Sequence, residues 1–428
     1  MPTLKGWIVA AIGAGVSITG RVFGSEAVVQ LGYALIILVI AAVIVVRLRR
    51  HELTVKRKVT PRRARPAESI TATIRIENSG RGSAPLLLIE DRLPPGLTGK
   101  ARFAVQGIER GGWRETGFDL TPSRRGRYEI GPLEISVVDP FGLARLKSGS
   151  PATSTFLVHP RIERLSLPRE PGERRSIVAT TTRNPTGSRG EDFYTLREYV
   201  EGDDLRKIHW ASTAKRGRYM IRQEETPWHT RATILIDDYA AAHDGAGPTS
   251  SFERAVTTAA SLVDLYFRVG YSYKVSGAID RGLPVGRGAD HRGRCLDLLS
   301  LISVVSGDDD PLMTRLIELD TSTAPEAALF VITGTMSSHA AAALAHASRR
   351  FRQTTVVSFP AHRFGSESTK ARWESEQQLV DVMRLLARSS IRGIALGPDE
   401  SLPAAWASLW TEKGSGAKGQ WGRRPELV

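Results

Sequence analysis

The segment Ala232–Asp238, ATILIDD, is a run of apolar residues that ends in two acids. After it, the chain alternates between amphipathic stretches of helical spacing, such as Phe252–Val269, and apolar runs, such as Glu326–Thr333 (EAALFVIT). Continuous apolar strands that alternate with helices are typical of a mostly parallel sheet covered on both faces. The sequence therefore predicts a doubly wound α/β domain over residues 232–410 and a flexible tail over residues 411–428.

The same periodicity predicts the other elements of this domain. The further predicted strands are Ser272–Ile279, Thr354–Pro360 and Ile391–Leu396, and the further predicted helices are Arg294–Val305, Ser338–Arg350, Trp373–Arg388 and Leu402–Trp410. Ligands of such folds bind at the carboxyl ends of the strands, so Asp237 and Asp238 are the candidates for a divalent ion. A polar strand end that only caps the sheet is the more ordinary explanation of the two acids.

The stretch upstream of this domain, Gly190–Glu225, gathers aromatic, acidic and basic side chains: GEDFYTLREYVEGDDLRKIHWASTAKRGRYMIRQEE. The apolar spacing within Phe193–Val200 predicts a short amphipathic turn or helix that Glu201–Asp204 breaks. Asp203 suits the N-cap of a second helix, and Gly217 suits its C-terminal end. We place this stretch in a linker and motif region over residues 166–231, with a strand following the second helix.

Two residues of this stretch suggest catalysis. His209 and Ser212 are three positions apart and can share a helix face. With Asp203 or Asp204 they would supply the residue types of a hydrolase triad. The stretch has no G-x-S-x-G elbow, however, and this spacing also arises by chance.

A structural and binding role is the alternative interpretation. We expect Ile208 and Trp210 to pack inward, while the charged side chains form a paired polar network. The candidate binding residues are Arg197, Tyr199, Gly202, Asp203, Arg206, His209 and Trp210.

Residues 51–165 carry short β-rich runs separated by turn residues. Ser69–Asn78 (SITATIRIEN) alternates apolar and polar residues almost throughout. Period-two alternation with frequent turns predicts an antiparallel β-sandwich of immunoglobulin-like type. We expect the string Arg124–Leu143 (RRGRYEIGPLEISVVDPFGL) to hold strands in register through its turns, with a ligand site as the alternative.

Residues 1–50 predict a transmembrane hairpin. Ala27–Val46 is an uncharged apolar stretch long enough to cross a hydrocarbon core, and Trp7–Phe23 is a shorter candidate for a first span. The basic residues after Val46 should stay cytoplasmic, which places the whole soluble part in the cytoplasm at the cell membrane. A signal peptide and a buried soluble helix are the competing explanations.

The charge of the chain argues for the same arrangement. The formal net charge is +14, which raises the possibility of nucleic-acid binding. Arg47–Arg65, however, holds nine Lys or Arg residues and one acid, and so places much of the excess beside an anionic membrane leaflet. We therefore expect no nucleic-acid partner. The single cysteine, Cys295, excludes an internal disulfide and a thiolate-rich zinc site.

Arg124–Leu143 followed by Gly190–Gly217 resembles the domain-of-unknown-function family 58. The resemblance implies a membrane-anchored protein whose last domain is similar to the von Willebrand factor A domain. The usage of Arg and Ala indicates a bacterial source. It also implies a MoxR-type AAA+ ATPase as a partner. No enzymatic activity is established for the family, and we expect a protein that is not an enzyme.

The von Willebrand factor A domain often binds Mg²⁺ through an Asp-x-Ser-x-Ser motif after its first strand. Only Asp237 matches this motif, because Tyr239 and Ala241 occupy the hydroxyl positions. A carboxylate pair without these hydroxyls is a poor octahedral site. We therefore expect no metal and no cofactor.

These observations predict a membrane-anchored scaffold or adaptor that faces the cytoplasm and binds a MoxR-type AAA+ ATPase. The alternatives are a hydrolase that uses His209 and Ser212 with Asp203 or Asp204, and a nucleic-acid-binding protein.

Overall fold

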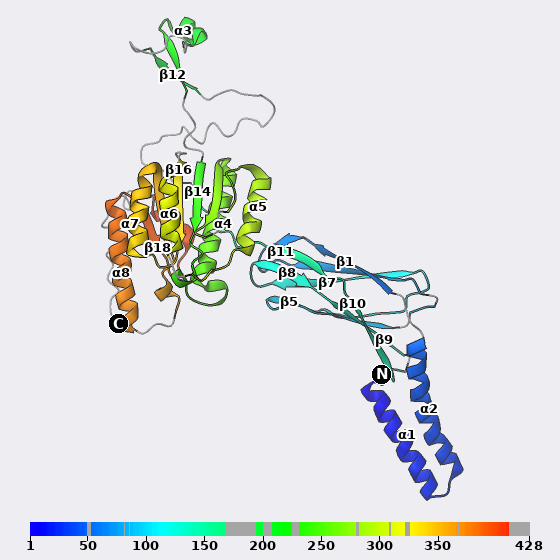
Figure 1. Cartoon of the computed structure of the whole chain (residues 1–428). Helices are drawn as coiled ribbons and strands as arrows, with labels where there is room; N and C mark the ends of the chain where they lie inside the picture. The colour runs from blue at the N-terminus through cyan, green and yellow to red at the C-terminus, as the bar shows by residue number, and fades with distance from the viewer. Residues whose placement is uncertain are drawn as a thin grey trace. The chain divides into compact units, whose positions relative to one another are not determined.

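The computed structural model describes residues 1–48, 53–80, 82–84, 86–139, 141–167, 194–199, 208–224, 231–279, 282–307, 310–321, 326–365 and 369–410. The chain forms two compact units, unit 1 (Met1–Arg161) and unit 2 (Ile162–Val428), which we describe separately (Figure 1). The predicted tail, residues 411–428, lies outside the described residues.

Unit 1 begins with two helices, α1 (Leu4–Val22) and α2 (Glu26–Leu48). The stretch Glu26–Arg47 of α2 has a mean hydropathy of 2.8 and is long and apolar enough to cross a membrane. Many of its apolar side chains are exposed; Ile37, for example, is 62% exposed. A surface of this kind is unfavourable in water and marks contact with lipid or another protein.

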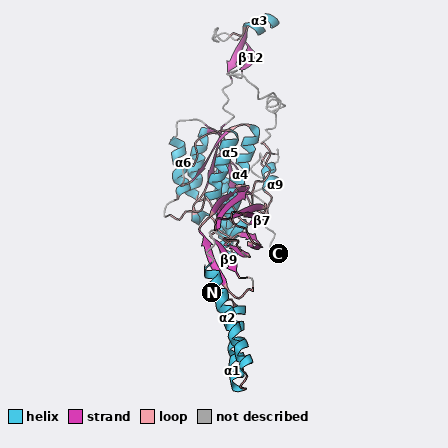
Figure 2. Ribbon diagram, turned by 90° about the vertical axis from the view of Figure 1, so that its right-hand side faces the viewer, coloured by secondary structure: helices cyan, strands magenta, loops and turns pink. Residues whose placement is uncertain are grey.

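Helices α1 and α2, both cyan in Figure 2, pack against each other at small residues. A Cβ atom added to Gly32 would lie 2.1 Å from Ser17 Oγ and 2.6 Å from the Gly13 carbonyl oxygen. Close backbone approach at small residues is the usual way that apolar helices associate where water provides no driving force.

The rest of unit 1 is a strand-rich region, residues 53–158. Its strands are β1 (Leu53–Thr60), β2 (Arg63–Ala64), β3 (Ile70–Asn78), β4 (Leu87–Asp91), β5 (Leu97–Gly99), β6 (Arg102–Val105), β7 (Trp113–Pro122), β8 (Gly126–Ile130), β9 (Leu133–Val138), β10 (Arg145–Ser150) and β11 (Ser154–Val158). They form sheets of order β1-β3-β7-β5, β10-β9-β4-β6 and β2-β11-β8. All pairs are antiparallel except β2 with β11.

One core fills the strand-rich region. The alternation of β3 buries Ile70, Ala72, Ile74 and Ile76 as the sequence predicts, because successive side chains of a strand face opposite sides. The string Arg124–Leu143 forms β8, β9 and the start of the turn between β9 and β10. Since β8 and β9 belong to different sheets, this string joins the sheets rather than forming a hairpin.

An ion pair lies inside this region. Arg57 of β1 and Asp91 of β4 approach to 2.8 Å, and neither side chain is more than 1% exposed. Burial raises the pKa of Asp91 to about 6, although Arg57 opposes the shift. Arg57 also donates to the Ile130 carbonyl oxygen over 2.5 Å, so a single guanidinium links three strands.

The sheet of unit 2 has five parallel strands in the order β15-β14-β16-β17-β18. The strands are β14 (Arg231–Ile236), β15 (Ser272–Gly277), β16 (Glu326–Thr333), β17 (Phe351–Ser358) and β18 (Arg392–Ala395). The helices are α4 (Ser251–Val269), α5 (Gly288–Leu301), α6 (Pro311–Thr321), α7 (Ser338–Ala347), α8 (Thr369–Arg388) and α9 (Leu402–Ser408). One core joins α4, α5 and α9 to one face of the sheet, and another joins α6, α7 and α8 to the other face (Figure 1).

Unit 2 confirms an α/β domain with a parallel sheet. The bounds of β16 agree with the prediction, whereas the predicted helix Arg294–Val305 is α5 and begins at Gly288. The sequence did not predict α6. Its first residue is Pro311, which suits the first turn of a helix but also signals a loop in the sequence.

The Arg57–Asp91 pair yields a stability prediction. We expect Asp91→Ala to lower the opening free energy of β4, measured by hydrogen exchange, by about 3–5 kcal/mol, because Arg57 is left buried without its partner charge. The control Arg102→Ala removes the exposed Arg102–Glu90 pair in the same sheet and should cost about 0–1 kcal/mol. Equal effects of the two substitutions would contradict this assignment.

Candidate functional site

The motif stretch folds as a small module, which we call the motif module (residues 194–199 and 208–224). It consists of β12 (Tyr194–Glu198), α3 (Trp210–Arg216) and β13 (Met220–Glu224), with β12 antiparallel to β13. The predicted helix within Phe193–Val200 is therefore wrong, because residues 194–198 pair as a strand. A short apolar run does not distinguish helix from strand until its partner is known.

The interior of the motif module is small. Ile208, Met220 and Ile221 are at most 8% exposed, and Ile208 bridges to Ile221. The prediction that Ile208 packs inward is confirmed. The helix α3 has seven residues and none of them is buried, so the apolar contacts come mainly from the strand side.

His209, and not Asp203 as predicted, is the N-cap of α3. The Ser212 amide donates to His209 Nδ1 over 3.2 Å, and Ser212 Oγ lies 2.9 Å from the same nitrogen. Because a backbone amide can only donate, Nδ1 is the unprotonated nitrogen, and the Ser212 hydroxyl also donates to it. The ring thus satisfies the first turn of α3 in the way that an Asn or Ser cap would.

The other end of α3 agrees with the prediction. Gly217 has φ 67° and its amide donates to the Thr213 carbonyl oxygen over 2.8 Å. A glycine tolerates this left-handed conformation without a steric penalty.

An aromatic cluster lies on the surface of the motif module. Tyr219 meets Trp210 edge to face at 6.4 Å and Tyr199 at 6.3 Å between ring centroids. Trp210 is 66% exposed and Tyr219 57% exposed. The prediction that Trp210 packs inward is wrong, because the module has too little interior to cover an indole next to the helix start.

Basic side chains accompany these rings. Lys215 and Arg216 are exposed in the last turn of α3, where cations interact favourably with the helix dipole. Arg218 pairs with Glu198 over 2.9 Å, and both side chains remain more than half exposed. We call Trp210, Tyr219, Lys215, Arg216 and Arg218 the motif surface.

The predicted binding residues divide into two groups. Arg197 lies in β12 opposite Ile221, and the Tyr199 amide donates to the Tyr219 carbonyl oxygen over 2.9 Å. The other group, Gly202, Asp203 and Arg206, lies outside the described residues, as does Asp204, the alternative acid of the predicted hydrolase triad. Sequence reasoning missed Tyr219 as a surface residue, although an aromatic residue two positions after the helix-ending Gly217 was a signal that could have found it.

Asp237 and Asp238, the candidate metal ligands, lie at the carboxyl end of β14 and are each 2% exposed. Asp237 Oδ2 accepts from the Thr333 hydroxyl over 2.7 Å, and Oδ1 accepts from the Tyr239 amide over 3.1 Å. Asp238 Oδ1 accepts from the Ile279 amide over 3.0 Å. These contacts tie the end of β14 to the last residue of β16 and to the segment that follows β15.

Further polar residues close this edge of the sheet. Asp310 Oδ1 accepts from the Met313 amide at the start of α6, and Oδ2 accepts from the Ser337 hydroxyl over 2.6 Å. Asp310 was missed in the sequence because α6 was missed. Across the described residues, no group of three or more His, Cys, Asp or Glu side chains is placed to hold a metal ion.

The segment after β14 packs directly on the strand ends. A Cβ atom on Gly334 would lie 1.8 Å from the Ala242 carbonyl oxygen, so only glycine fits there. His243 Nε2 donates to the Asp237 carbonyl oxygen over 2.8 Å, and burial lowers the pKa of His243 to about 4. The polar groups at this edge of the sheet are therefore bonded to other groups of the protein.

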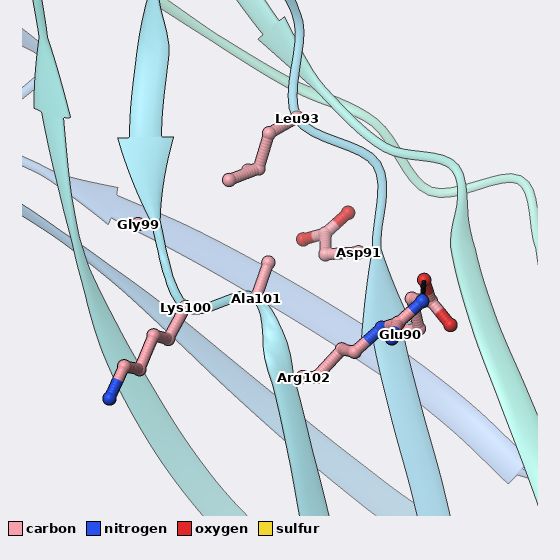
Figure 3. Close-up of a pocket in the computed structure, with 7 residues that line it drawn as sticks. All are labelled: Glu90, Asp91, Leu93, Gly99, Lys100, Ala101 and Arg102. Atoms are coloured by element: carbon pink, nitrogen blue, oxygen red, sulfur yellow. Dashed lines mark hydrogen bonds and ion pairs between the residues drawn. The ribbon is translucent and has the colours of Figure 1, made fainter.

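The strand-rich region has a shallow pocket of about 370 Å³ (Figure 3). Its lining residues are Glu90, Asp91, Leu93, Gly99, Lys100, Ala101 and Arg102. Glu90 is paired with Arg102 and Asp91 with Arg57. Because these acids already have charged partners within the protein, the pocket is a weaker candidate than the motif surface.

The buried acid of β14 gives a pH-dependent prediction. Burial is the main cause that raises the pKa of Asp237 to about 7, so the folded protein keeps a proton that the unfolded chain releases near pH 4. Stability contributed by this group is therefore lost as the pH rises from about 4 to about 7. The Asp237→Asn variant has no carboxyl group to titrate at this position. Its free energy of unfolding minus that of wild type should therefore rise by up to about 4 kcal/mol between about pH 4 and about pH 7.

The measurement is chemical denaturation of the full chain in detergent at several pH values. His243 is present in both proteins, so its own titration cancels in the difference. The control Asp381→Asn changes an exposed carboxylate of α8 and should show no such trend. A stability difference between Asp237→Asn and wild type that is constant with pH would contradict the prediction.

Comparisons with known proteins give one informative match. No curated protein matches the sequence. Among solved structures, the CARDB domain of the PF1109 protein from Pyrococcus furiosus has 19% identity, a TM-score of 0.20, and coverage of 25% of this chain and 86% of that chain. A FixG-related protein from Vibrio parahaemolyticus has 12% identity, a TM-score of 0.17, and coverage of 25% of this chain and 95% of that chain. Likeness at this level does not identify a shared fold.

The model of the family described as "Protein of unknown function DUF58" matches residues 195–359. The match includes the motif module and the sheet from β14 to β17, and it does not extend to the string Arg124–Leu143. Residues 195–359 therefore match the DUF58 family, in agreement with the resemblance of Gly190–Gly217.

Proposed function

We propose that this protein is a membrane-anchored adaptor, not an enzyme, whose motif surface binds a MoxR-type AAA+ ATPase in the cytoplasm. The observation that carries the proposal is the exposed pair Trp210 and Tyr219 on the motif module. The choice of partner comes from the family resemblance. The proposal also fits the edge of the parallel sheet, where the described acids bond to groups of the protein itself.

Exposed aromatic rings beside cations are the composition expected of a protein-binding surface. Trp, Tyr and Arg are enriched at the centres of interfaces and dominate their energetics. An indole that is two-thirds exposed costs solvation free energy that burial against a partner would recover. Lys215, Arg216 and Arg218 favour a partner surface with acidic residues around an apolar centre.

We further propose that α1 and α2 both cross the membrane. Their mutual packing at Gly13, Ser17 and Gly32 supports a paired arrangement. The basic stretch Arg47–Arg65 supports a cytoplasmic position for everything after α2.

We also propose a fold type for the strand-rich region and for the α/β domain of unit 2. The core shared by largely antiparallel sheets supports an immunoglobulin-like sandwich for the strand-rich region. The parallel sheet with helices on both faces supports a von Willebrand factor A-like domain in unit 2. In this proposal that domain uses no metal, because the hydroxyl positions after Asp237 are Tyr239 and Ala241.

The binding proposal is tested by affinity capture. The tagged full chain, solubilised from its own cells after mild crosslinking, should recover a AAA+ ATPase identified by mass spectrometry. Trp210→Ala and Tyr219→Ala should each lower the recovery about ten-fold or more, as expected for residues at the centre of an interface. Both side chains are exposed, so their truncation should leave the fold intact.

The matched control is Trp373→Ala, which removes an indole of α8 that is 64% exposed. It should leave recovery unchanged. The proposal fails if the intact chain recovers no such ATPase, or if the three variants recover it equally well.

A hydrolase remains a second candidate because Ser212 Oγ lies 2.9 Å from His209 Nδ1. His209→Asn separates the two functions, since asparagine is a good N-cap but cannot act as a general base. We expect His209→Asn to retain ATPase capture, and we expect wild type to show no hydrolysis of ester and phosphoester substrates. Hydrolysis by wild type that disappears in both His209→Asn and Ser212→Ala would favour the hydrolase instead.

A further inference from the structure

The first residues of the chain pair with the turn between β9 and β10. We call Asp139 and Phe141–Ala144 the docking turn. Pro2 forms an antiparallel bridge with Ala144, and the Arg145 amide donates to the Met1 carbonyl oxygen over 2.9 Å. The Thr3 amide donates to the Leu143 carbonyl oxygen over 2.8 Å, and its hydroxyl donates to the Gly142 carbonyl oxygen over 2.6 Å.

The same turn packs on the two N-terminal helices. Thr3 is the N-cap of α1, so the docking turn bonds to the residue from which α1 starts. A Cβ atom on Gly6 would lie 2.2 Å from the Leu143 carbonyl oxygen, which only glycine permits. Leu143 and Ala144 share an apolar cluster with Val39, Ala42 and Val46 of α2.

The conformation of the docking turn is held from within. The Asp139 carboxylate accepts from the Phe141 amide over 3.0 Å and from the Ala144 amide over 2.5 Å. The Gly142 amide donates to the Asp139 carbonyl oxygen over 2.9 Å. These bonds fix the direction in which Phe141 leaves the turn.

Phe141 is 69% exposed, although its neighbours Leu143 and Ala144 are buried. It lies one residue from the contact with Thr3, and Trp7, itself 64% exposed, is one helical turn further along α1. Lys5, Arg47 and Arg145 are also exposed on the same elements. Aromatic rings with Lys and Arg at the end of an apolar helix are typical of the interface between a bilayer and water.

We propose that the docking turn is a lipid-contact site, in which Phe141 lies at the headgroup level of the bilayer and Lys5, Arg47 and Arg145 face anionic headgroups. This inference rests on the membrane anchoring proposed above. The lipid is favoured over a protein partner because the site is continuous, through Thr3 and Gly6, with helices whose own apolar surfaces are exposed.

The contact has a mechanical consequence. A strand-rich region linked only through the chain after α2 would be free to turn. A second attachment through Met1–Thr3 and a third through Phe141 would restrict that rotation. The strand-rich region would then keep one face towards the bilayer.

The test uses the full chain in vesicles of phosphatidylcholine and phosphatidylglycerol. Cys295 is fully buried, so a new cysteine can carry an environment-sensitive fluorophore alone. Three labelled variants are compared: Phe141→Cys, Ile37→Cys on the exposed side of α2, and Arg124→Cys in the turn between β7 and β8. Lipids brominated near the headgroup, lipids brominated deep in the chain, and aqueous iodide serve as quenchers.

We expect the label at position 141 to lose most of its fluorescence to the shallow brominated lipid and to resist iodide. The label at 37 should respond to the deep quencher, and the label at 124 only to iodide. If 37 responds to the deep quencher but 141 behaves like 124, the lipid contact is wrong and the anchor stands. If 37 also responds only to iodide, the membrane anchoring itself is wrong. Resistance of 141 to all three quenchers would indicate a protein partner at the docking turn and would overturn the inference.

Discussion

The uncharged stretch of α2 between Glu26 and Arg47 constrains the rest of this protein. Its apolar side chains are largely uncovered by the described residues, and an exposed surface of that size is unfavourable in water. In the proposed account the bilayer covers it, so every later element is held at a membrane surface. The motif surface would then be presented to a partner at the membrane, and the protein would not diffuse freely through the cytoplasm.

The polar chemistry of unit 2 contrasts with that of the motif module. At the sheet edge, Asp237, Asp238 and Asp310 accept hydrogen bonds from neighbouring strands and helices, and the edge is closed by tight packing at Gly334. In the motif module, Trp210 and Tyr219 remain open to solvent. In the proposed account, this contrast fits recognition by the motif surface rather than catalysis at the edge of the sheet.

Local periodicity was sufficient to predict the parallel sheet, the alternation of β3, and α2, because each depends on residues close in sequence. It failed where a distant partner decides the outcome. Residues 194–198 are a strand only because β13 pairs with them, and Trp210 is exposed because the motif module has a very small interior. Asp310 was not recognised from the sequence because α6, whose first turn bonds to its carboxylate, was not predicted. The contact between Thr3 and the docking turn joins residues about 140 positions apart, which no local pattern encodes.

Photo-crosslinking from position 210 in living cells tests the central claim most directly. A photoreactive phenylalanine analogue replaces Trp210, and a second protein carries the same analogue at Trp373 as the reference for an exposed indole elsewhere. The account predicts that light joins position 210, but not position 373, to a AAA+ ATPase at the membrane. Crosslinks from position 210 only to lipid or to unrelated proteins, or the same products from both positions, would contradict it.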